Sequence, residues 1–327
     1  MKHRHFLAIL LGMLLASCGS VETLSFDELR PAVYSLPPQA GNVAVINNAV
    51  PTSQHKRGIV TLGYLYGDGV LASQSLADVL ADSRYFNQVV ICDSAFRDSQ
   101  DTPYRQFTQD EVDEIAADLG VDVVLSLDEI IVNTRRHGHP DVHPMFQHET
   151  IEAKVTPVLH VYLPERKKPL YTIALSDSLE WDVEEGLSDK VIVEEMAYAA
   201  AIALGRTLVP YWSPVTRHYY DGGSVTVRDA GVNVRKGNWE RARELWQKAY
   251  DSGGSKKKRA RLAYNLALAS ERLDDIEAAE SWVTKSLELS AEGSDMHSSA
   301  KLYKHRVDER KTQLQLLKAQ MERFEGE

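Results

Sequence analysis

The chain has 327 residues and carries 47 acidic against 37 basic side chains, which gives a formal net charge of −10 at neutral pH. This acidic balance excludes binding to nucleic acid or to an anionic membrane surface through general electrostatic attraction. The length is sufficient for two domains, and two cysteines are too few for a disulfide framework.

The first 17 residues have the architecture of an export signal. A basic flank at residues 1–5 precedes an apolar run at residues 6–16, which is shorter than the roughly 20 residues of a membrane span. Residues 15–18 read Leu-Ala-Ser-Cys, the pattern of a lipobox. We therefore expect removal of residues 1–17 and a diacylglyceryl and N-acyl lipid on Cys18, with no other cofactor. The alternative is an ordinary secretory signal beside an incidental cysteine.

Residues 18–41 contain several prolines and little periodicity, which predicts a lipidated tether. Residues 42–212 alternate between strand and helix patterns. Thr108 and Glu111 have the spacing of a capping box, and Gly120 ends the helix that they begin. The elements are expected, in the order β-α-β-α-β-β-β-α, at residues 43–46, 71–80, 86–92, 108–119, 121–132, 151–163, 169–181 and 190–208. This order predicts a mixed sheet with helices packed on it.

A proline-containing segment at residues 210–214 marks the boundary to a second, all-helical domain. Residues 237–249 and 274–286 share a pattern of small and apolar residues at an offset of 37, close to the roughly 34-residue tetratricopeptide period. We expect tetratricopeptide-like repeats over residues 213–295 and a capping helix over residues 296–327. A partner-binding or coiled-coil helix is the alternative for the last segment.

The densest unusual feature is a histidine-rich segment at residues 137–148. It holds four of the eleven histidines, His137, His139, His143 and His148. Histidine binds zinc or copper, and a loop of this composition could wrap an ion. The spacing fits no closed structural site, however, and the prolines favour an exposed connection between two strands. The favoured interpretation is a surface loop whose histidines only gain and lose protons. A metal-binding lipoprotein that uses these four residues is the alternative.

The sequence contains no nucleophile elbow, no H-E-x-x-H helix and no phosphate-binding P-loop, so we assign no catalytic residue and expect a non-enzymatic role. Repeat stacks bind segments of other proteins on a concave surface. Here that partner-binding surface is predicted to include Asn233, Tyr264, Asn265 and Leu268. We therefore expect an adapter or scaffold that binds another protein, with repeats that merely brace the first domain as a competing interpretation.

A third hypothesis is a ring-forming secretion component. Such a protein would need a long alternating segment able to enter a membrane. Residues 151–163 alternate only partly, because Glu152, Lys154 and Pro157 interrupt the pattern.

Several short motifs, in this order, carry a family resemblance. They are Arg30-Pro31-Ala32, Leu36-Pro37, Val43-Ala44-Val45-Ile46-Asn47-Asn48, Ser83-x-Tyr85-Phe86 and Pro210-x-Trp212-x-x-Val215-x-Arg217-x-Tyr219-Tyr220. With the lipobox, they resemble an uncharacterised lipoprotein family of the Bacteroidota, a family of unknown function. The resemblance implies a mixed α/β domain followed by tetratricopeptide-type helices, and it transfers no catalytic residue.

The order of elements in the first domain also resembles the N-terminal domain of TolB and the curli-secretion and penicillin-binding-protein-activator lipoproteins. That resemblance implies an envelope protein that assembles with other envelope proteins, although fold alone does not establish function. It further implies attachment to the outer membrane through lipid. A position facing the periplasm is favoured, because residues 19–22 lack the dense acidic run of a surface-export tag.

Overall fold

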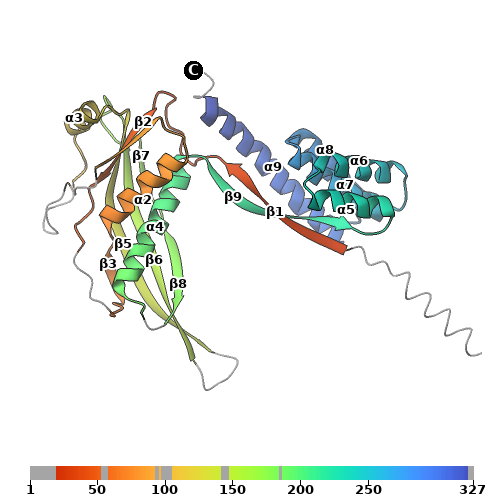
Figure 1. Cartoon of the computed structure of the whole chain (residues 1–327), viewed down its shortest axis with the longest axis horizontal. Helices are drawn as coiled ribbons and strands as arrows, with labels where there is room; N and C mark the ends of the chain where they lie inside the picture. The colour runs from red at the N-terminus through yellow and green to blue at the C-terminus, as the bar shows by residue number, and fades with distance from the viewer. Residues whose placement is uncertain are drawn as a thin grey trace, which may run out of the picture. The chain divides into compact units, whose positions relative to one another are not determined.

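A computed structural model describes residues 20–52, 58–92, 96, 105–140, 147–183 and 186–322 (Figure 1). The predicted signal and Cys18 lie outside these residues, as does His143. The chain forms two compact units. One, here called the helical unit, comprises residues 1–30 and 212–318, and the other, the α/β unit, comprises residues 31–211 and 319–327.

The α/β unit is built on a mixed sheet of seven strands, with the order β4-β2-β5-β6-β7 and with β3 and β8 paired to β5 and β6. The strands are β2 (Asn42–Asn47), β3 (Gly63–Tyr66), β4 (Gln88–Cys92), β5 (Val123–Pro140), β6 (Gln147–Tyr162), β7 (Tyr171–Ala174) and β8 (Asp177–Asp182). β2 runs parallel to β4 and β5, and the other pairs are antiparallel. The prediction of a mixed sheet is confirmed.

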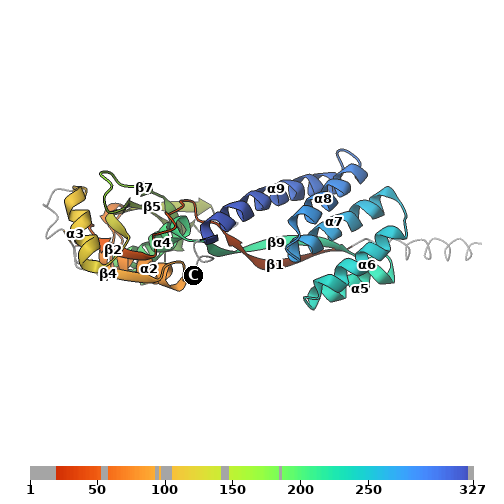
Figure 2. The same cartoon turned by 90° about the horizontal axis from the view of Figure 1, so that it is seen from above.

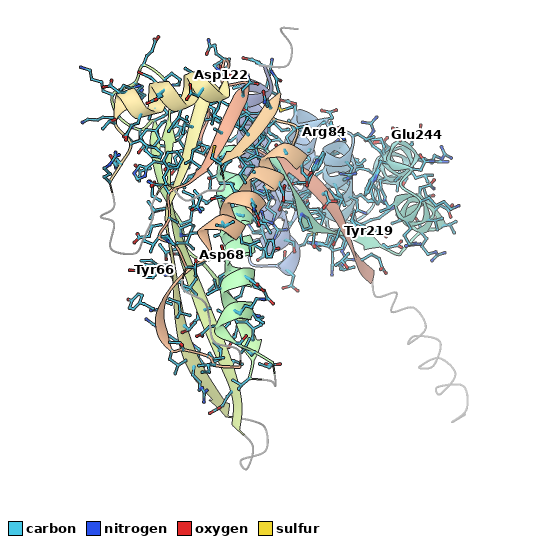
Figure 3. The ribbon with its side chains drawn as sticks, turned by 60° about the vertical axis from the view of Figure 1, so that its left-hand side comes forward. Tyr66, Asp68, Arg84, Asp122, Tyr219 and Glu244 are labelled. Carbon is cyan, nitrogen blue, oxygen red and sulfur yellow. The ribbon has the colours of Figure 1, made fainter. Side chains whose placement is uncertain are left out.

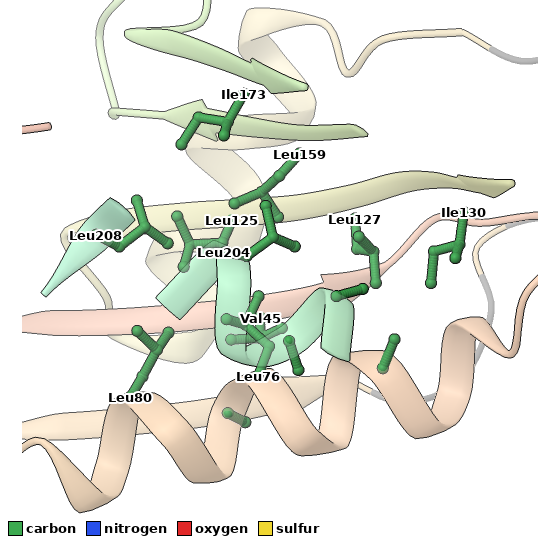
Figure 4. Packing of buried hydrophobic residues seen from close by; sticks show 14 of the residues in the cluster. Val45, Leu76, Leu80, Leu125, Leu127, Ile130, Leu159, Ile173, Leu204 and Leu208 are labelled. Atoms are coloured by element: carbon green, nitrogen blue, oxygen red, sulfur yellow. The ribbon is translucent and has the colours of Figure 1, made fainter. Parts of the chain in front are cut away.

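Helices cover both faces of this sheet. α2 (Gly69–Asp82) and α4 (Asp189–Leu208) lie on one face, where they bury Leu76 and Leu204 against Val45 (Figures 1 and 4). α3 (Gln109–Leu119) packs with Ile46 on the opposite face. Successive side chains of a strand point to opposite faces, so the apolar run of β2 is buried on both sides, as its sequence requires.

Local polar contacts fix the ends of these elements. Thr108 and Glu111 form the predicted capping box of α3, and Gly120 ends that helix in the left-handed conformation at φ 65°. Asp68 caps α2 by accepting a hydrogen bond from the backbone N–H of Leu71 at 2.9 Å (Figure 3). The capping box and the helix end were both readable from the sequence because their signals are local.

The single strand predicted over residues 169–181 is two strands, β7 and β8, which pair with successive parts of β6. The break falls beside Pro157 of β6, which has no backbone N–H to donate across the sheet. β5 and β6 also extend beyond the predicted ends. His137, His139 and His148 therefore lie on the paired arms of a hairpin rather than in a loop.

In the part of the helical unit that the structure describes, a two-stranded sheet is combined with five helices. The sheet pairs β1 (Ser20–Arg30) with β9 (Tyr211–Asp221). The helices are α5 (Val225–Arg235), α6 (Trp239–Asp251), α7 (Lys256–Arg272), α8 (Ile276–Leu289) and α9 (Asp295–Met321). Among them, α5 and α6, α6 and α7, and α7 and α8 are neighbours (Figure 2). A helical C-terminal region is thus confirmed. The tetratricopeptide-like arrangement of its helices stays a prediction.

Two segments of the helical unit differ from the sequence predictions. Residues 20–30, expected in a tether, form β1. Residues 211–221, which span the predicted end of the α/β domain at residue 212 and the predicted start of the repeats, form β9. The small residues shared by the two repeats, Ala242 and Ala279, are fully buried in the core of the unit. Among the described residues, no helix has the length and apolar character that crossing a membrane requires.

Candidate functional site

A cavity of about 890 Å³ in the helical unit opens between the two-stranded sheet and the ends of three helices. We call it the α7 groove. Thr23 of β1 and His218 and Tyr220 of β9 form one side, and Lys257 and Arg261 of α7 form another. The end of α8 and the start of α9 close it. The groove therefore depends on the pairing of β1 with β9, two strands that are almost 200 residues apart in the chain.

Stacked aromatic rings form the floor of the groove. The ring of His218 stacks on that of Tyr264 with centroids 4.8 Å apart, and Tyr220 meets Tyr264 edge-on at 5.5 Å. Burial raises the pKa of the Tyr264 hydroxyl above its ordinary range. Burial, and then the charge of Arg306, lowers the pKa of His218. Both side chains are therefore uncharged at neutral pH, and the floor is an aromatic surface without charge of its own.

Basic side chains of α7 border this floor. The first turn of α7 contains lysines and no acidic residue. Cations are disfavoured at a helix N-terminus, so these lysines are not placed there to stabilise the helix. Among the described residues, neither Lys256 nor Lys257 forms an ion pair. Arg261 lies over the Tyr220 ring at 5.1 Å, and its buried Nε has no hydrogen-bond partner. Two acidic residues also line the groove, namely Glu288, which is paired with Lys285 at 2.9 Å, and Asp295 at the start of α9. The groove thus offers Lys256, Lys257 and Arg261 as cations that form no ion pair within the described part of the chain.

Three of the four predicted partner-binding residues are inside the unit. Tyr264, Asn265 and Leu268 are at most 2% exposed, so their side chains do not form the predicted surface. Asn233 is half-buried and donates a hydrogen bond from Nδ2 to the carbonyl oxygen of Asp229 at 2.8 Å. The correction has a simple cause, because α7 is surrounded by β9, α6, α8 and α9 and has no exposed concave face along these positions.

Tyr264 and Asn265 instead hold the groove from beneath. They contact His218 and Tyr220, which line it. Lys256, Lys257 and Arg261 were not among the residues predicted from the sequence. The signal available for them was the basic run at residues 256–261, five cations in six residues.

A buried ion network joins the sheet of the helical unit to its helices. Arg217 of β9 donates from Nη2 to Glu28 of β1 and to Glu271 of α7, each at 2.8 Å. The hydroxyl of Tyr303 in α9 donates to Glu271 at 2.6 Å. All four residues are buried. Burial, and then the charge of Glu271, raises the pKa of Tyr303 well above its ordinary value. Charge-assisted hydrogen bonds of this kind fix the geometry of the elements that they join.

The α/β unit contains its own buried polar cluster. Asp128 accepts hydrogen bonds from Asn48 at 2.7 Å and from Ser126 at 2.6 Å, and it bonds to Nδ1 of His160. Nε2 of His160 lies 3.0 Å from the amide of Gln106. The cluster lies beside the carboxyl end of β2. In the sheet, β4 pairs with one side of β2 and β5 with the other, so the strand order reverses at this point. Ligands of open α/β sheets bind at such a point. Here the Ser126 hydroxyl is engaged by Asp128, and the hydrogen bonds join neighbouring strands.

The predicted metal ligands are only partly described. His137 forms a pair with Glu152, with Nε2 and Oε2 2.9 Å apart. The backbone of β5 places His139 directly opposite His148 of β6. Among the described side chains, no group of three or more histidine, cysteine, aspartate or glutamate residues converges as a metal site would. Metal binding at the four predicted histidines remains a prediction.

The fold and the groove define a two-unit protein, with a mixed α/β sheet in one unit and a helical unit that presents a cationic groove. The chain matches the family described as "Domain of unknown function (DUF8603)" over residues 40–220 and that described as "Domain of unknown function (DUF6340)" over residues 228–309. The first match covers more than half of the 327 residues, and the chain belongs to the DUF8603 family. The expectation of a family of unknown function is confirmed. A comparison with curated proteins finds no match.

Proposed function

We propose that this protein is a lipid-anchored, non-catalytic adapter of the bacterial cell envelope, and that its α7 groove binds an acidic segment of another protein. The observation that carries the proposal is the groove itself, an aromatic floor bordered by Lys256, Lys257 and Arg261, none of which forms an ion pair among the described residues. Its volume of about 890 Å³ is within the range of ligand sites and accommodates several side chains of an extended peptide.

The charges favour selectivity as well as attraction. The chain as a whole carries a net charge of −10, so it repels acidic proteins at a distance. A segment that reaches the groove meets cations without an ion pair among the described residues, and Arg261 can contact it while remaining over the ring of Tyr220. A positively charged site on a negatively charged protein discriminates against acidic proteins that do not reach the site.

The proposed anchor places the groove near the membrane. Cys18 precedes Val21, which lines the groove, by three residues. An extended chain covers at most about 3.6 Å per residue, so about 11 Å of backbone separates the lipidated residue from the groove. The partner segment would therefore be held close to the membrane surface, in our proposal the periplasmic face of the outer membrane.

Site-specific photo-crosslinking in intact cells tests the groove. A photoreactive residue at Ala291, which is exposed at the groove, should give a crosslinked product. The double variant Lys256→Glu/Lys257→Glu should abolish the product, because it reverses the charge without breaking an ion pair. Lys236→Glu, at an exposed position after α5, is the control for one such charge reversal outside the groove. A product that is unchanged in the double variant rules out binding through this groove.

The anchor is tested separately. Cys18→Ser should move the protein from the membrane fraction to the soluble fraction. If the variant stays in the membrane fraction when the groove charges are also reversed, the proposed lipidation is wrong.

Metal binding is a second candidate function, favoured by one observation. The register of β5 and β6 sets His139 opposite His148, and His137 is two residues from His139 on the same strand. Elemental analysis of the purified protein should then give a stoichiometric metal that is lost when His137, His139 and His148 are changed to Ala. Absence of metal from the unmodified protein after incubation with zinc or copper removes this function.

A further inference from the structure

A second cavity of the helical unit, of about 320 Å³, is lined by an unusual number of arginines. They are Arg30 of β1, Arg217 of β9, and Arg306 and Arg310 of α9. We call this cavity the arginine pocket. The acidic side chains in its lining are Glu28 and Glu309. In a chain with an excess of acid, four guanidinium groups around one small cavity are a local reversal of charge.

The hydrogen bonds show which of these cations are already used. Arg217 is engaged by Glu28 and Glu271 through Nε and Nη2. Arg30 uses Nη2 for Glu28 at 3.2 Å, and Arg310 uses Nη1 for the carbonyl oxygen of Leu29 at 2.7 Å. These two guanidinium groups therefore retain further donors.

Arg306 is the free cation of the pocket. It forms neither a hydrogen bond nor an ion pair with any described residue, although it lines the cavity. The neighbouring carboxylate of Glu309 lies 3.3 Å from His305 instead, on an exposed part of α9. The planar fork of donors of this lining residue therefore has no partner among the described residues.

The pocket also contains like charges close together and buried polar atoms without hydrogen-bond partners. Burial lowers the pKa of Arg310, Glu28 opposes this effect, and the nearby charge of Arg30 lowers it further. A guanidinium stays protonated in proteins, so this crowding of like charges persists. In addition, Nε of Arg30 and Oε1 of Gln313 are buried without hydrogen-bond partners. Buried polar atoms without partners are rare and costly, and a bound ligand with its water would satisfy them.

We propose that the arginine pocket binds a phosphate-type anion, either inorganic phosphate or the phosphate of a phosphomonoester. Arginine forks bind such oxyanions through paired hydrogen bonds. Arg30 belongs to β1, whereas Arg306 and Arg310 belong to α9, so the pocket is lined by arginines of two elements, which suits a tetrahedral group better than a planar carboxylate. The site is separate from the α7 groove, so the proposal does not depend on the adapter function.

Isothermal titration calorimetry with sodium phosphate at constant ionic strength tests the site. The protein is the chain from residue 18 onward with Cys18→Ser, and sodium chloride serves as the reference titrant. We expect saturable binding of phosphate that Arg306→Gln weakens at least about tenfold, because the variant loses a charged group that hydrogen-bonds the anion. Arg306 has no partner among the described residues, so this variant should keep the fold, which circular dichroism verifies.

Matched variants separate a specific site from general charge. Arg241→Gln removes an exposed arginine of α6 that is paired with Glu244, and it should bind phosphate as the unmodified protein does. Glu309→Gln removes a negative charge at the pocket and should bind phosphate more tightly. Heats that match those of chloride, or equal affinities for the unmodified protein and Arg306→Gln, overturn the proposal.

Vesicles distinguish the source of the phosphate. Co-sedimentation with vesicles that contain phosphatidic acid, reversed by free phosphate and lost in Arg306→Gln, identifies a lipid headgroup as the source. Binding of free phosphate without binding to these vesicles identifies a soluble phosphomonoester. Both results support the site, and free phosphate that neither binds the protein nor releases it from vesicles excludes it.

Discussion

The side-chain amide of Asn265 hydrogen-bonds both backbone groups of Tyr220. Its Oδ1 accepts from the N–H of Tyr220 and its Nδ2 donates to the carbonyl oxygen of Tyr220, each at 2.8 Å. Asn265 is fully buried in α7, while Tyr220 lies near the end of β9. A helix side chain thus supplies the pairing that a neighbouring strand would give, and it fixes β9 where it lines the α7 groove.

Asn265→Ala should therefore destabilise the helical unit. Removal of the amide leaves two backbone groups of Tyr220 without partners, and each such group costs about 1–3 kcal/mol when it is buried. Because Tyr220 is only half-buried, we expect a loss of about 2 kcal/mol in the free energy of unfolding, measured by urea denaturation. Asn233→Ala is the control and should cost about 0.5 kcal/mol or less. Equal effects of the two substitutions would contradict this role of Asn265.

The buried network around Arg217 predicts a larger effect. Arg217→Met leaves the carboxylates of Glu28 and Glu271 buried without their cation, and breaking a buried pair in this way costs about 3–5 kcal/mol. Adding Glu28→Gln and Glu271→Gln should restore part of the loss, since these changes remove the stranded charges. Chemical denaturation followed by tryptophan fluorescence gives both values. A triple variant less stable than Arg217→Met would show that the charges are not coupled.

This network also explains why β1 was not predicted. Residues 24, 26 and 28 lie on the inward side of the strand, but the third is Glu28, which breaks the apolar alternation that identifies a strand. A buried glutamate becomes understandable only beside Arg217, which is 189 residues away in the chain. Long-range charge pairing leaves no periodic signal in a sequence. By contrast, the capping box of Thr108 and Glu111 is local, and it was predicted correctly.

The α7 groove was hidden for a related reason. The basic run at residues 256–261 is visible in the sequence, but such a run usually marks a solvated helix face. It becomes part of a site only because β1, β9 and the end of α8 lie across from it. The prediction of Tyr264 and Asn265 depended on the repeat pattern, and that pattern identifies residues that pack between helices. They are accordingly part of the core.

The polar cluster of the α/β unit gives a third prediction. Asp128 is 1% exposed and receives hydrogen bonds from Asn48 and Ser126 while it bonds to His160. Asp128→Asn keeps the shape but turns one acceptor into a donor that faces other donors. We expect a loss of about 2–4 kcal/mol in the free energy of unfolding. Asp118→Asn, at an exposed position on α3, should change stability by less than about 0.5 kcal/mol. Unfolding curves that coincide for both variants would mean that the cluster does not stabilise the sheet.

The capping box of α3 makes the stability of the α/β unit depend on pH. Hydrogen bonds from the Arg105 side chain and from the Thr108 backbone lower the pKa of Glu111 to about 2, from an ordinary value of 4.5. Because the pKa is depressed in the folded state, the stabilisation is complete above about pH 4.5. It is lost as the pH falls toward 2.

Glu111→Gln isolates this contribution. The glutamine can still reach the Thr108 backbone, but it cannot form the charged pair with Arg105. The pair is partly exposed, so the variant should be less stable at pH 7 by about 1 kcal/mol or less, and salt should reduce the difference. Thermal unfolding at pH 7, 4 and 2.5 should show that the difference between the two proteins shrinks as the pH falls. Glu114→Gln, an exposed change on the same helix, controls for the loss of one negative charge. A difference that is constant from pH 7 to pH 2.5 would mean that ionised Glu111 does not stabilise this helix.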